Sequence, residues 1–279
     1  MIATVCTMDA SDTHTRPRVD AAVERLRAAL RDRIPCSPLT DLIDPDDVAT
    51  AYAVQQRLTD LRIFDGATVV GRKIGLTSPA VQAQLGVNQP DFGVLFDDMA
   101  FAAGAELPSE RLLQPRAEAE VAFVLGADLV DGPLEVADVR AAVSHVVAAL
   151  EIVDSRIAGW DITFADTVAD NASAGLYVLG SQRRTLAEVE PGKVEMRMLV
   201  DGDVVSTGNG AACLGDPLEA LAWLARTARE FGEPLRAGQV VLSGALGPMY
   251  PVQPGARVTA EITGLGSVTT IFSGQEDRA

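Results

Sequence analysis

The sequence has few of the residues on which disulfide-rich and soft-metal proteins depend. Its three cysteines, Cys6, Cys36 and Cys213, are widely spaced and form no CxxC pair. Neither a disulfide framework nor a thiolate metal site is therefore indicated. The only histidines, His14 and His145, lie far apart in the sequence. A metal that prefers imidazole or thiolate ligands has no cluster to bind, which leaves oxygen ligands.

The sequence also lacks long apolar runs and an excess of positive charge. No stretch approaches ~18 consecutive apolar residues, so we expect no membrane span, and the N-terminus has no apolar signal-peptide core. The formal net charge of −16 disfavours nucleic acid and anionic membranes as partners. We expect a soluble cytoplasmic protein, in which an anionic substrate would need a local cation.

Hydrophobic periodicity predicts an α+β fold with a helical N-terminal region on a β-rich body. We expect a flexible tail at 1–16, a helical region at 17–95 and the β-rich catalytic body at 96–279. Helices are predicted at 19–30, 44–61, 78–86, 135–149 and 216–231, with Asp44 and Asp216 as caps of the second and the last. Strand-like runs occur at 119–125, 150–153, 175–179, 194–200, 239–243, 257–262 and 267–272. Asp201-Gly202 and the turn around Leu265 predict two hairpins.

The stretch "QPRAEAEVAFVLG" places two glutamates at the start of an apolar strand. Side chains two apart in a strand share a face, so Glu118 and Glu120 would project together while Val121 and Phe123 line the other face. Two buried carboxylates repel each other, and a divalent cation would relieve this. A solvated strand face is the plainer interpretation, because charged residues are mostly exposed.

Glu151 strengthens the hypothesis of a metal site. It lies in "VVAALEIVDSR", an apolar stretch that offers its carboxylate no local partner. As a core residue it would be destabilising, whereas as a third ligand beside Glu118 and Glu120 it has a function. Three carboxylates suit hard cations, so we predict a Mg²⁺ or Mn²⁺ site.

Two further stretches have the composition of functional segments. "GRKIGLTSPAVQAQLGVNQPDFG" sets Arg72 and Lys73 beside a glycine, where a lysine could receive an anionic substrate or transfer protons. A surface basic pair is the simpler alternative. "DTVADNASAGLYVLG" carries Ser173 in a polar loop before a strand, a common setting for site residues. A third such stretch, the glycine-rich strand exit "VVLSGALGPMYPV", suits a close approach of backbone amides to a ligand, with a plain turn as the alternative. It is neither a phosphate-binding P-loop nor a GxSxG nucleophile turn.

These stretches, taken in order along the chain, resemble the 2-keto-4-pentenoate hydratases of the fumarylacetoacetate hydrolase superfamily. The resemblance covers about residues 40 to 272, from "GRKIGLT" and "QPDFG" through "ALEIVDSRI" to "VVLSGALGPM". It implies a mixed β-roll and a Mg²⁺ or Mn²⁺ ion on the positions of Glu118, Glu120 and Glu151. It also implies catalytic roles for Lys73 and Asp91 and places Ser173, with Arg72, among the substrate-binding residues.

The implied reaction adds water to 2-hydroxypenta-2,4-dienoate, or a close 2-hydroxy-2,4-dienoate, and gives a 4-hydroxy-2-oxoacid. Such hydratases act in the meta-cleavage degradation of aromatic compounds. The resemblance further implies a homo-oligomer, with a downstream aldolase or a sister decarboxylase as possible partners.

Two alternatives remain open from the sequence. A sister decarboxylase acting on 2-oxo-3-enedioates (4-oxalocrotonate) would use a similar metal site, because both reactions need charge stabilisation at C2. A non-catalytic metal-binding scaffold subunit is the alternative from another class. A C–C bond hydrolase that activates water with a histidine is disfavoured, because neither His14 nor His145 lies in a matching stretch.

Overall fold

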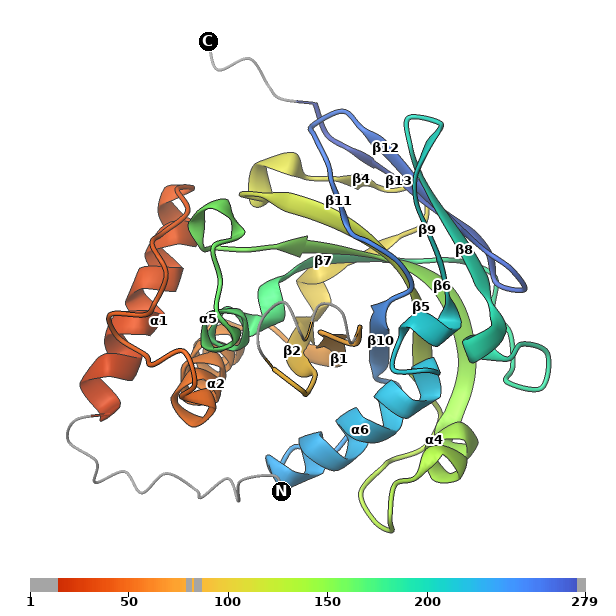
Figure 1. The fold of residues 1–279 in the computed structure, drawn as a ribbon, viewed down its shortest axis with the longest axis horizontal. Coiled ribbons are helices and arrows are strands. Elements are labelled where there is room, and N and C mark those ends of the chain that lie inside the picture. The colour runs from red at the N-terminus through yellow and green to blue at the C-terminus, as the bar shows by residue number, and fades with distance from the viewer. Residues whose placement is uncertain (1–14, 79–81, 83–86, 275–279) are drawn as a thin grey trace.

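The computed structural model describes residues 15–78, 82 and 87–274. Its main helices flank two β-sheets (Figure 1). The helices are α1 (Thr15–Asp32), α2 (Val48–Phe64), α4 (Val136–Ala142), α5 (Phe164–Ala169) and α6 (Pro217–Glu230). Within the described residues, no helix combines the length and apolarity needed to cross a membrane.

The larger sheet has the strand order β2-β1-β10-β5-β6-β7-β3, with β11 also paired to β5. Its strands are β1 (Val69–Gly75), β2 (Asp91–Phe96), β3 (Ala100–Ala102), β5 (Pro115–Leu125), β6 (Val143–Asp154), β7 (Ala174–Leu179), β10 (Val240–Ala245) and β11 (Tyr250–Pro251). β5 and β6 are long and strongly curved, and the sheet curls so that β1 and β2 lie within the bend (Figure 1). β1 runs parallel to β10 and antiparallel to β2.

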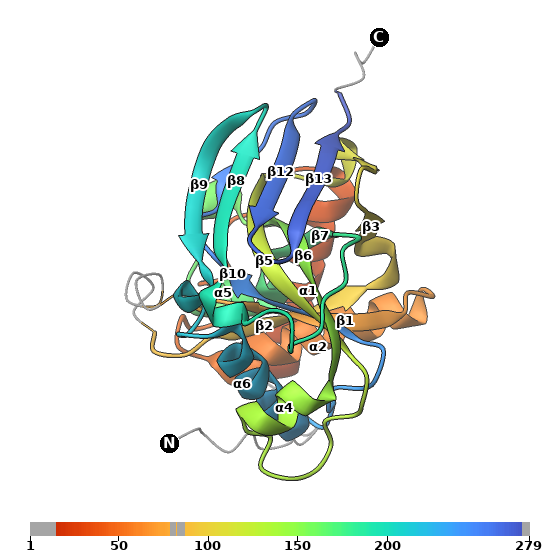
Figure 2. The same ribbon diagram turned by 90° about the vertical axis from the view of Figure 1, so that its right-hand side faces the viewer.

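The smaller sheet has the order β4-β13-β12-β8-β9 and packs on the outer face of the larger one. Its strands are β4 (Glu106–Leu107), β8 (Glu195–Val200), β9 (Asp203–Asn209), β12 (Arg257–Ile262) and β13 (Gly266–Phe272). Figure 2 shows β9, β8, β12 and β13 side by side over β5 and β6. The main core fills the space between the sheets and against α6, with Phe123, Leu150 and Val258 fully buried in it. A second apolar cluster joins α1, α2 and α5.

Several predicted elements are confirmed. The helices at 19–30 and 216–231 correspond to α1 and α6, and the Asp216 side chain caps α6 by accepting a hydrogen bond from the Leu218 amide. Asp201 and Gly202 both have positive φ and join β8 to β9, as a tight hairpin turn requires. The turn around Leu265 joins β12 to β13. Elements of both kinds and the mixed sheets confirm the α+β class.

Other expectations were wrong. The helix predicted at 135–149 ends at Ala142, and Val143 begins β6. The following run is rich in β-branched residues and pairs with β5 along its whole length, so strand pairing outweighs the local helical pattern. The second helix starts at Val48 with Asp47 as its cap, not at Asp44. The short helix predicted at 78–86 lies largely outside the described residues.

The region 17–95 contains more than helices. β1 and β2 belong to this region, yet they share a sheet with β5 and β6 from the body. Both strands are short and carry several glycines and polar residues, which weakens the alternating signal of a strand. The division of the chain at residue 95 stays a prediction.

Candidate metal centre and active site

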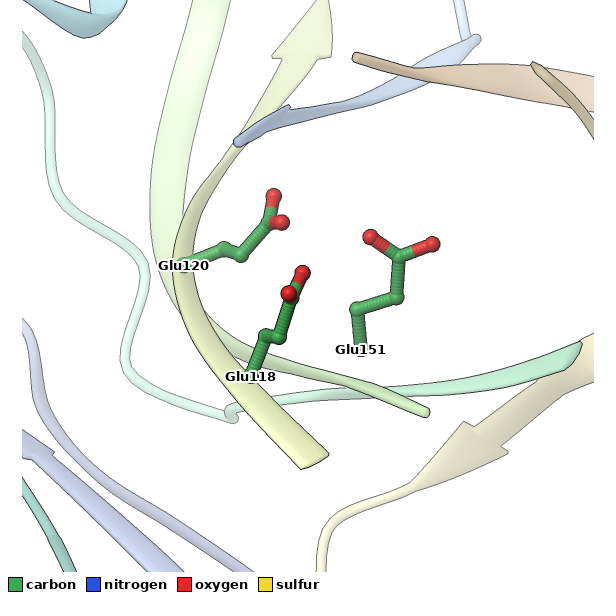
Figure 3. Close-up of side chains that lie close together, drawn as sticks. All are labelled: Glu118, Glu120 and Glu151. Atoms are coloured by element: carbon green, nitrogen blue, oxygen red, sulfur yellow. The ribbon is translucent and has the colours of Figure 1, made fainter. Parts of the chain in front are cut away.

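Three glutamates meet on the inner face of the curved β5–β6 pair. Glu118 lies directly opposite Glu151 in the antiparallel ladder, and Glu120 follows two residues along β5 on the same face. One carboxylate oxygen from each lies within 4.8 Å of the others. Figure 3 shows all three side chains converging. The predicted face sharing of Glu118 and Glu120 is therefore present, and Glu151 joins them through strand register.

The carboxylates are buried with too few donors. Glu120 and Glu151 are 0% and 1% exposed, while Glu118 is half-buried. The Gly244 amide donates to Glu120 Oε2 at 2.8 Å, but Glu120 Oε1 and Glu151 Oε2 have no hydrogen-bond donor among the described residues. Burial and the neighbouring carboxylate charges raise the pKa of Glu118 to about 7 and hold that of Glu120 well above its usual range. Converging, unsatisfied carboxylate oxygens fit a hard divalent cation.

Lys73 is the buried cation beside this cluster. Its Nζ lies 3.2 Å from Glu151 Oε1 and donates to the Ala172 carbonyl at 2.9 Å. Burial by itself lowers the pKa of Lys73, but the charges of Glu151, Asp91 and the other two glutamates outweigh burial and raise it above its usual value. One ammonium group thus faces several carboxyl groups, so the site holds more acidic groups than cations.

Asp91 lies on the same face of the β1–β2 pair as Lys73. It begins β2 opposite Gly75, is 1% exposed and accepts a hydrogen bond from Thr167 Oγ1 at 3.2 Å. Its Oδ1 has no donor. A Cβ on Gly75 would lie 2.1 Å from that oxygen, so only glycine leaves room for the carboxylate. Burial raises the pKa of Asp91 despite the nearby ammonium of Lys73.

The loop before β7 brings Ser173 to this region in a strained conformation. Asn171, Ala172 and Ser173 all have φ between 50° and 57°. Such left-handed backbone costs about 1 kcal/mol or more per non-glycine residue and gathers at functional sites. The Asn171 side chain stabilises the loop by exchanging two hydrogen bonds with the Val94 backbone on β2. The loop thereby directs the Ala172 carbonyl at Lys73, while the buried Ser173 hydroxyl lies 3.5 Å from Asp170 Oδ2.

Arg72 is not brought to the glutamates. Adjacent residues of a strand point to opposite faces, so Arg72 lies on the other side of β1 from Lys73. Its guanidinium forms an ion pair with Glu233, close to Tyr52, Phe92 and Phe231. The predicted role of Arg72 in substrate binding stays a prediction without a supporting contact.

Two groups at the site were not singled out from the sequence. The Gly244 amide, which holds Glu120, lies in the glycine-rich strand exit, whose composition indicated a close backbone approach. Thr167 orients Asp91 from α5. Its hydroxyl belongs to the polar segment before β7, but nothing in the sequence indicates which strand that segment contacts.

Comparisons with known proteins show the family to which the chain belongs. Residues 68–272 match the family described as fumarylacetoacetate (FAA) hydrolase C-terminal. The chain is 53% identical over 249 residues to a 2-keto-4-pentenoate hydratase of Burkholderia vietnamiensis, covering 89% of this chain and 95% of that protein. It is 50% identical over 256 residues to the hydratase of the same name from Paraburkholderia phymatum, covering 92% and 98%.

A solved structure has the same fold. The fold superposes with a TM-score of 0.87 on 4-oxalocrotonate decarboxylase from Pseudomonas putida G7, complexed with magnesium and adipate. The two chains are 35% identical, and the match covers 92% of this chain and 98% of the other. The chain belongs to the fumarylacetoacetate hydrolase family, and its mixed sheets confirm the fold expected from the sequence.

Proposed function

We propose that this protein is a metal-dependent hydratase that adds water to 2-hydroxypenta-2,4-dienoate or a close 2-hydroxy-2,4-dienoate. The observation that carries the proposal is the convergence of Glu118, Glu120 and Glu151 beside Lys73 and Asp91, with a buried oxygen on each of Glu120 and Glu151 that has no hydrogen-bond donor among the described residues. The two hydratases that share half of their residues with this chain support the reaction type. The product is a 4-hydroxy-2-oxoacid, and degradation of aromatic compounds by meta-cleavage is the proposed setting.

Glu118, Glu120 and Glu151 would hold Mg²⁺ or Mn²⁺. When bound, the ion supplies Lewis-acid stabilisation of negative charge on the C2 oxygen of the substrate. The carboxylates have unused oxygens, and the neighbour with 35% identity is complexed with magnesium, which favours Mg²⁺. The ion would also allow an anionic substrate to bind in an acidic protein, because its positive charge offsets the glutamates that would repel the substrate.

Lys73 and Asp91 are proposed to move protons. The dienol loses its O2 proton and gains one at C5, which gives a conjugated 2-oxo-3-enoate. Water then adds its oxygen at C4 while C3 takes a proton, so the net change is one water. Lys73 would carry the protons, and its ion pair with Glu151 and its hydrogen bond to the Ala172 carbonyl support this role. Asp91, whose Oδ1 has no hydrogen-bond donor among the described residues, would orient Lys73 or position water.

Ser173 is proposed to bind the substrate carboxylate or the C2 oxygen. Its hydroxyl is buried, and it follows Ala172, whose carbonyl accepts a hydrogen bond from Lys73, in the same strained loop. Its only hydrogen-bond partner among the described residues is the long contact to Asp170. A homo-oligomeric assembly, an aldolase or decarboxylase partner and a cytoplasmic location stay predictions.

The decarboxylase is the second candidate, because the solved neighbour with 35% identity bears that name. The deciding experiment uses metal-stripped protein with Mg²⁺ or Mn²⁺ added back. Loss of the dienol absorbance of 2-hydroxypenta-2,4-dienoate, with a product heavier by one water, is the expected result. CO₂ release from 2-oxohex-3-enedioate without hydration would replace the proposal with the decarboxylase. No turnover of either acid by metal-loaded protein would favour the scaffold subunit.

A further inference from the structure

Arg116 lies next to the glutamates along β5. It precedes Glu118 by two residues in a ladder whose register is continuous from Pro115 to Val124, so its side chain leaves the strand on the face that carries Glu118 and Glu120. Its charge reaches the cluster, because it opposes the upward shift of the Glu118 pKa. Arg116 is half-buried, in contrast to Lys73, which is fully enclosed.

The guanidinium of Arg116 is held by an aromatic ring. It lies 4.5 Å from the centroid of the Trp160 ring, within the range of a cation–π contact. Trp160 is itself fixed, because its Nε1 donates to the Gln114 carbonyl at 3.1 Å, and the Gly159 amide donates to Gln114 Oε1 at 2.7 Å. Trp160 adopts a φ of 59°, a conformation rare for a bulky residue. The ring thus limits the motion of the guanidinium.

Arg116 has no acidic partner in the part of the chain that the structure describes. The stacking leaves the N–H groups at the edge of the guanidinium available, apart from a long contact to Met249 Sδ. Arg116 and Trp160 also line a groove of about 1710 Å³. A cation without an acidic partner among the described residues therefore lines an open groove and shares a strand face with Glu118 and Glu120.

We propose that Arg116 is a substrate-binding residue that receives the C1 carboxylate of a 2-oxo or 2-hydroxy acid entering from this groove. The inference rests on the proposed function of the glutamate site and adds a residue to it. Lys73 is engaged by Glu151 and the Ala172 carbonyl, whereas Arg116 presents a free planar donor set. Guanidinium groups bind carboxylates in a bidentate manner, which selects for an acid over its ester or amide.

The test measures binding of 2-oxopentanoate, a saturated acid that keeps the C1 carboxylate and the C2 oxygen and cannot be hydrated at C4. Isothermal titration with Mg²⁺-saturated protein compares the parent chain with Arg116→Gln, Arg116→Lys and a control, Arg197→Gln. Arg197 lies on β8, is exposed and pairs with Glu261, so its replacement changes the net charge equally. We expect about 10- to 100-fold weaker binding for Arg116→Gln. Arg116→Lys should be intermediate, and Arg197→Gln should resemble the parent chain.

Affinity for Mg²⁺ alone separates substrate binding from a structural role. If Arg116 binds substrate, its removal should weaken the binding of 2-oxopentanoate. The affinity for Mg²⁺ alone should stay unchanged or rise slightly, because a nearby cation is gone. Parallel losses of both affinities in Arg116→Gln would mean that the side chain only supports the strand, and would overturn the proposal. Unchanged 2-oxopentanoate binding, or no Mg²⁺-dependent binding by the parent chain, would also overturn it. Because this readout needs no turnover, a protein that fails to hydrate dienoates but loses acid binding in Arg116→Gln would refute the hydratase proposal alone.

Discussion

The two faces of the β5–β6 pair have opposite chemical character, one apolar and one acidic. One face carries Val121, Phe123 and Leu150, which are fully buried against the smaller sheet. The other carries Glu118, Glu120 and Glu151, and a buried oxygen on each of Glu120 and Glu151 has no hydrogen-bond donor among the described residues. The apolar face stabilises the fold, and the glutamate face stores repulsion that a cation can relieve. Binding and stability are therefore separable by single substitutions on neighbouring residues.

The largest expected effect is on turnover, from Lys73→Met. If Lys73 moves protons, kcat should fall about 10²- to 10⁴-fold. Mg²⁺ affinity should stay the same or rise, because a competing buried cation has been removed. The measurement combines dienol absorbance with Mg²⁺ titration of the same preparation. Full turnover with Mg²⁺ bound would remove the lysine from the mechanism.

The apolar face is tested by Phe123→Ala. Phe123 is 0% exposed in the main core, so its truncation should lower the free energy of unfolding by about 3–5 kcal/mol. Mg²⁺ affinity of the protein that remains folded should change little, since Phe123 points away from the glutamates. Urea unfolding and metal titration at low temperature measure the two quantities. A matched loss of Mg²⁺ affinity would show that the two faces are not independent.

Glu120→Gln should give the opposite pattern. Losing a ligand charge should weaken Mg²⁺ binding by about 100-fold or more, because the remaining oxygens offer fewer negative charges to a hard cation. The metal-free variant should unfold at a higher temperature than the metal-free parent at neutral pH, since Glu120 ionises freely in the unfolded chain whereas the fold raises its pKa and disfavours its charge. Calorimetric melting with and without Mg²⁺ reads both effects. An unchanged Mg²⁺ affinity would contradict the three-ligand assignment.

The smallest expected effect is the pH dependence of the melting temperature of the metal-free protein. The pKa of Glu118 rises from the usual 4.5 to about 7 on folding, so the folded state binds the proton more tightly than the unfolded chain. This stabilisation is complete below about pH 4.5 and is lost as the pH rises through 7. The melting temperature should fall by a few degrees between pH 5 and 8, and less in Glu118→Gln. Identical pH profiles for the two proteins would show that Glu118 is not responsible.

The site was predictable where it depends on local pattern and less so where it depends on pairing. Successive side chains of a strand point to opposite faces, so the spacing of Glu118 and Glu120 by two residues is enough to predict that they share a face. Glu151 was identified by its lack of a partner, but only the β5–β6 register shows that it lies opposite Glu118. The predicted helix up to residue 149 would have left residues 143–149 without a strand partner. The pairing of this segment with β5 makes it a strand instead.

Arg72 and Lys73 show the same distinction on β1. The two residues are adjacent in the sequence, and we predicted a functional role for both. In a strand they point to opposite faces, and only Lys73 forms an ion pair with one of the three glutamates. The positive φ of Asn171, Ala172 and Ser173 was likewise invisible, because no glycine marks the turn. The Asn171 side chain holds that loop through bonds to β2, a strand distant in sequence.

The sequence by itself determined the chemistry available to this protein: oxygen ligands without histidine or thiolate competitors, one lysine in a polar segment, and strands with one apolar face. Composition and short-range periodicity are local properties, and they can be read from neighbouring residues. The tertiary structure alone decided which carboxylates converge, which of two adjacent cations joins them, and that Arg116 remains unpaired beside them. Those outcomes depend on strand register and on contacts between distant segments, whose energies no local pattern contains.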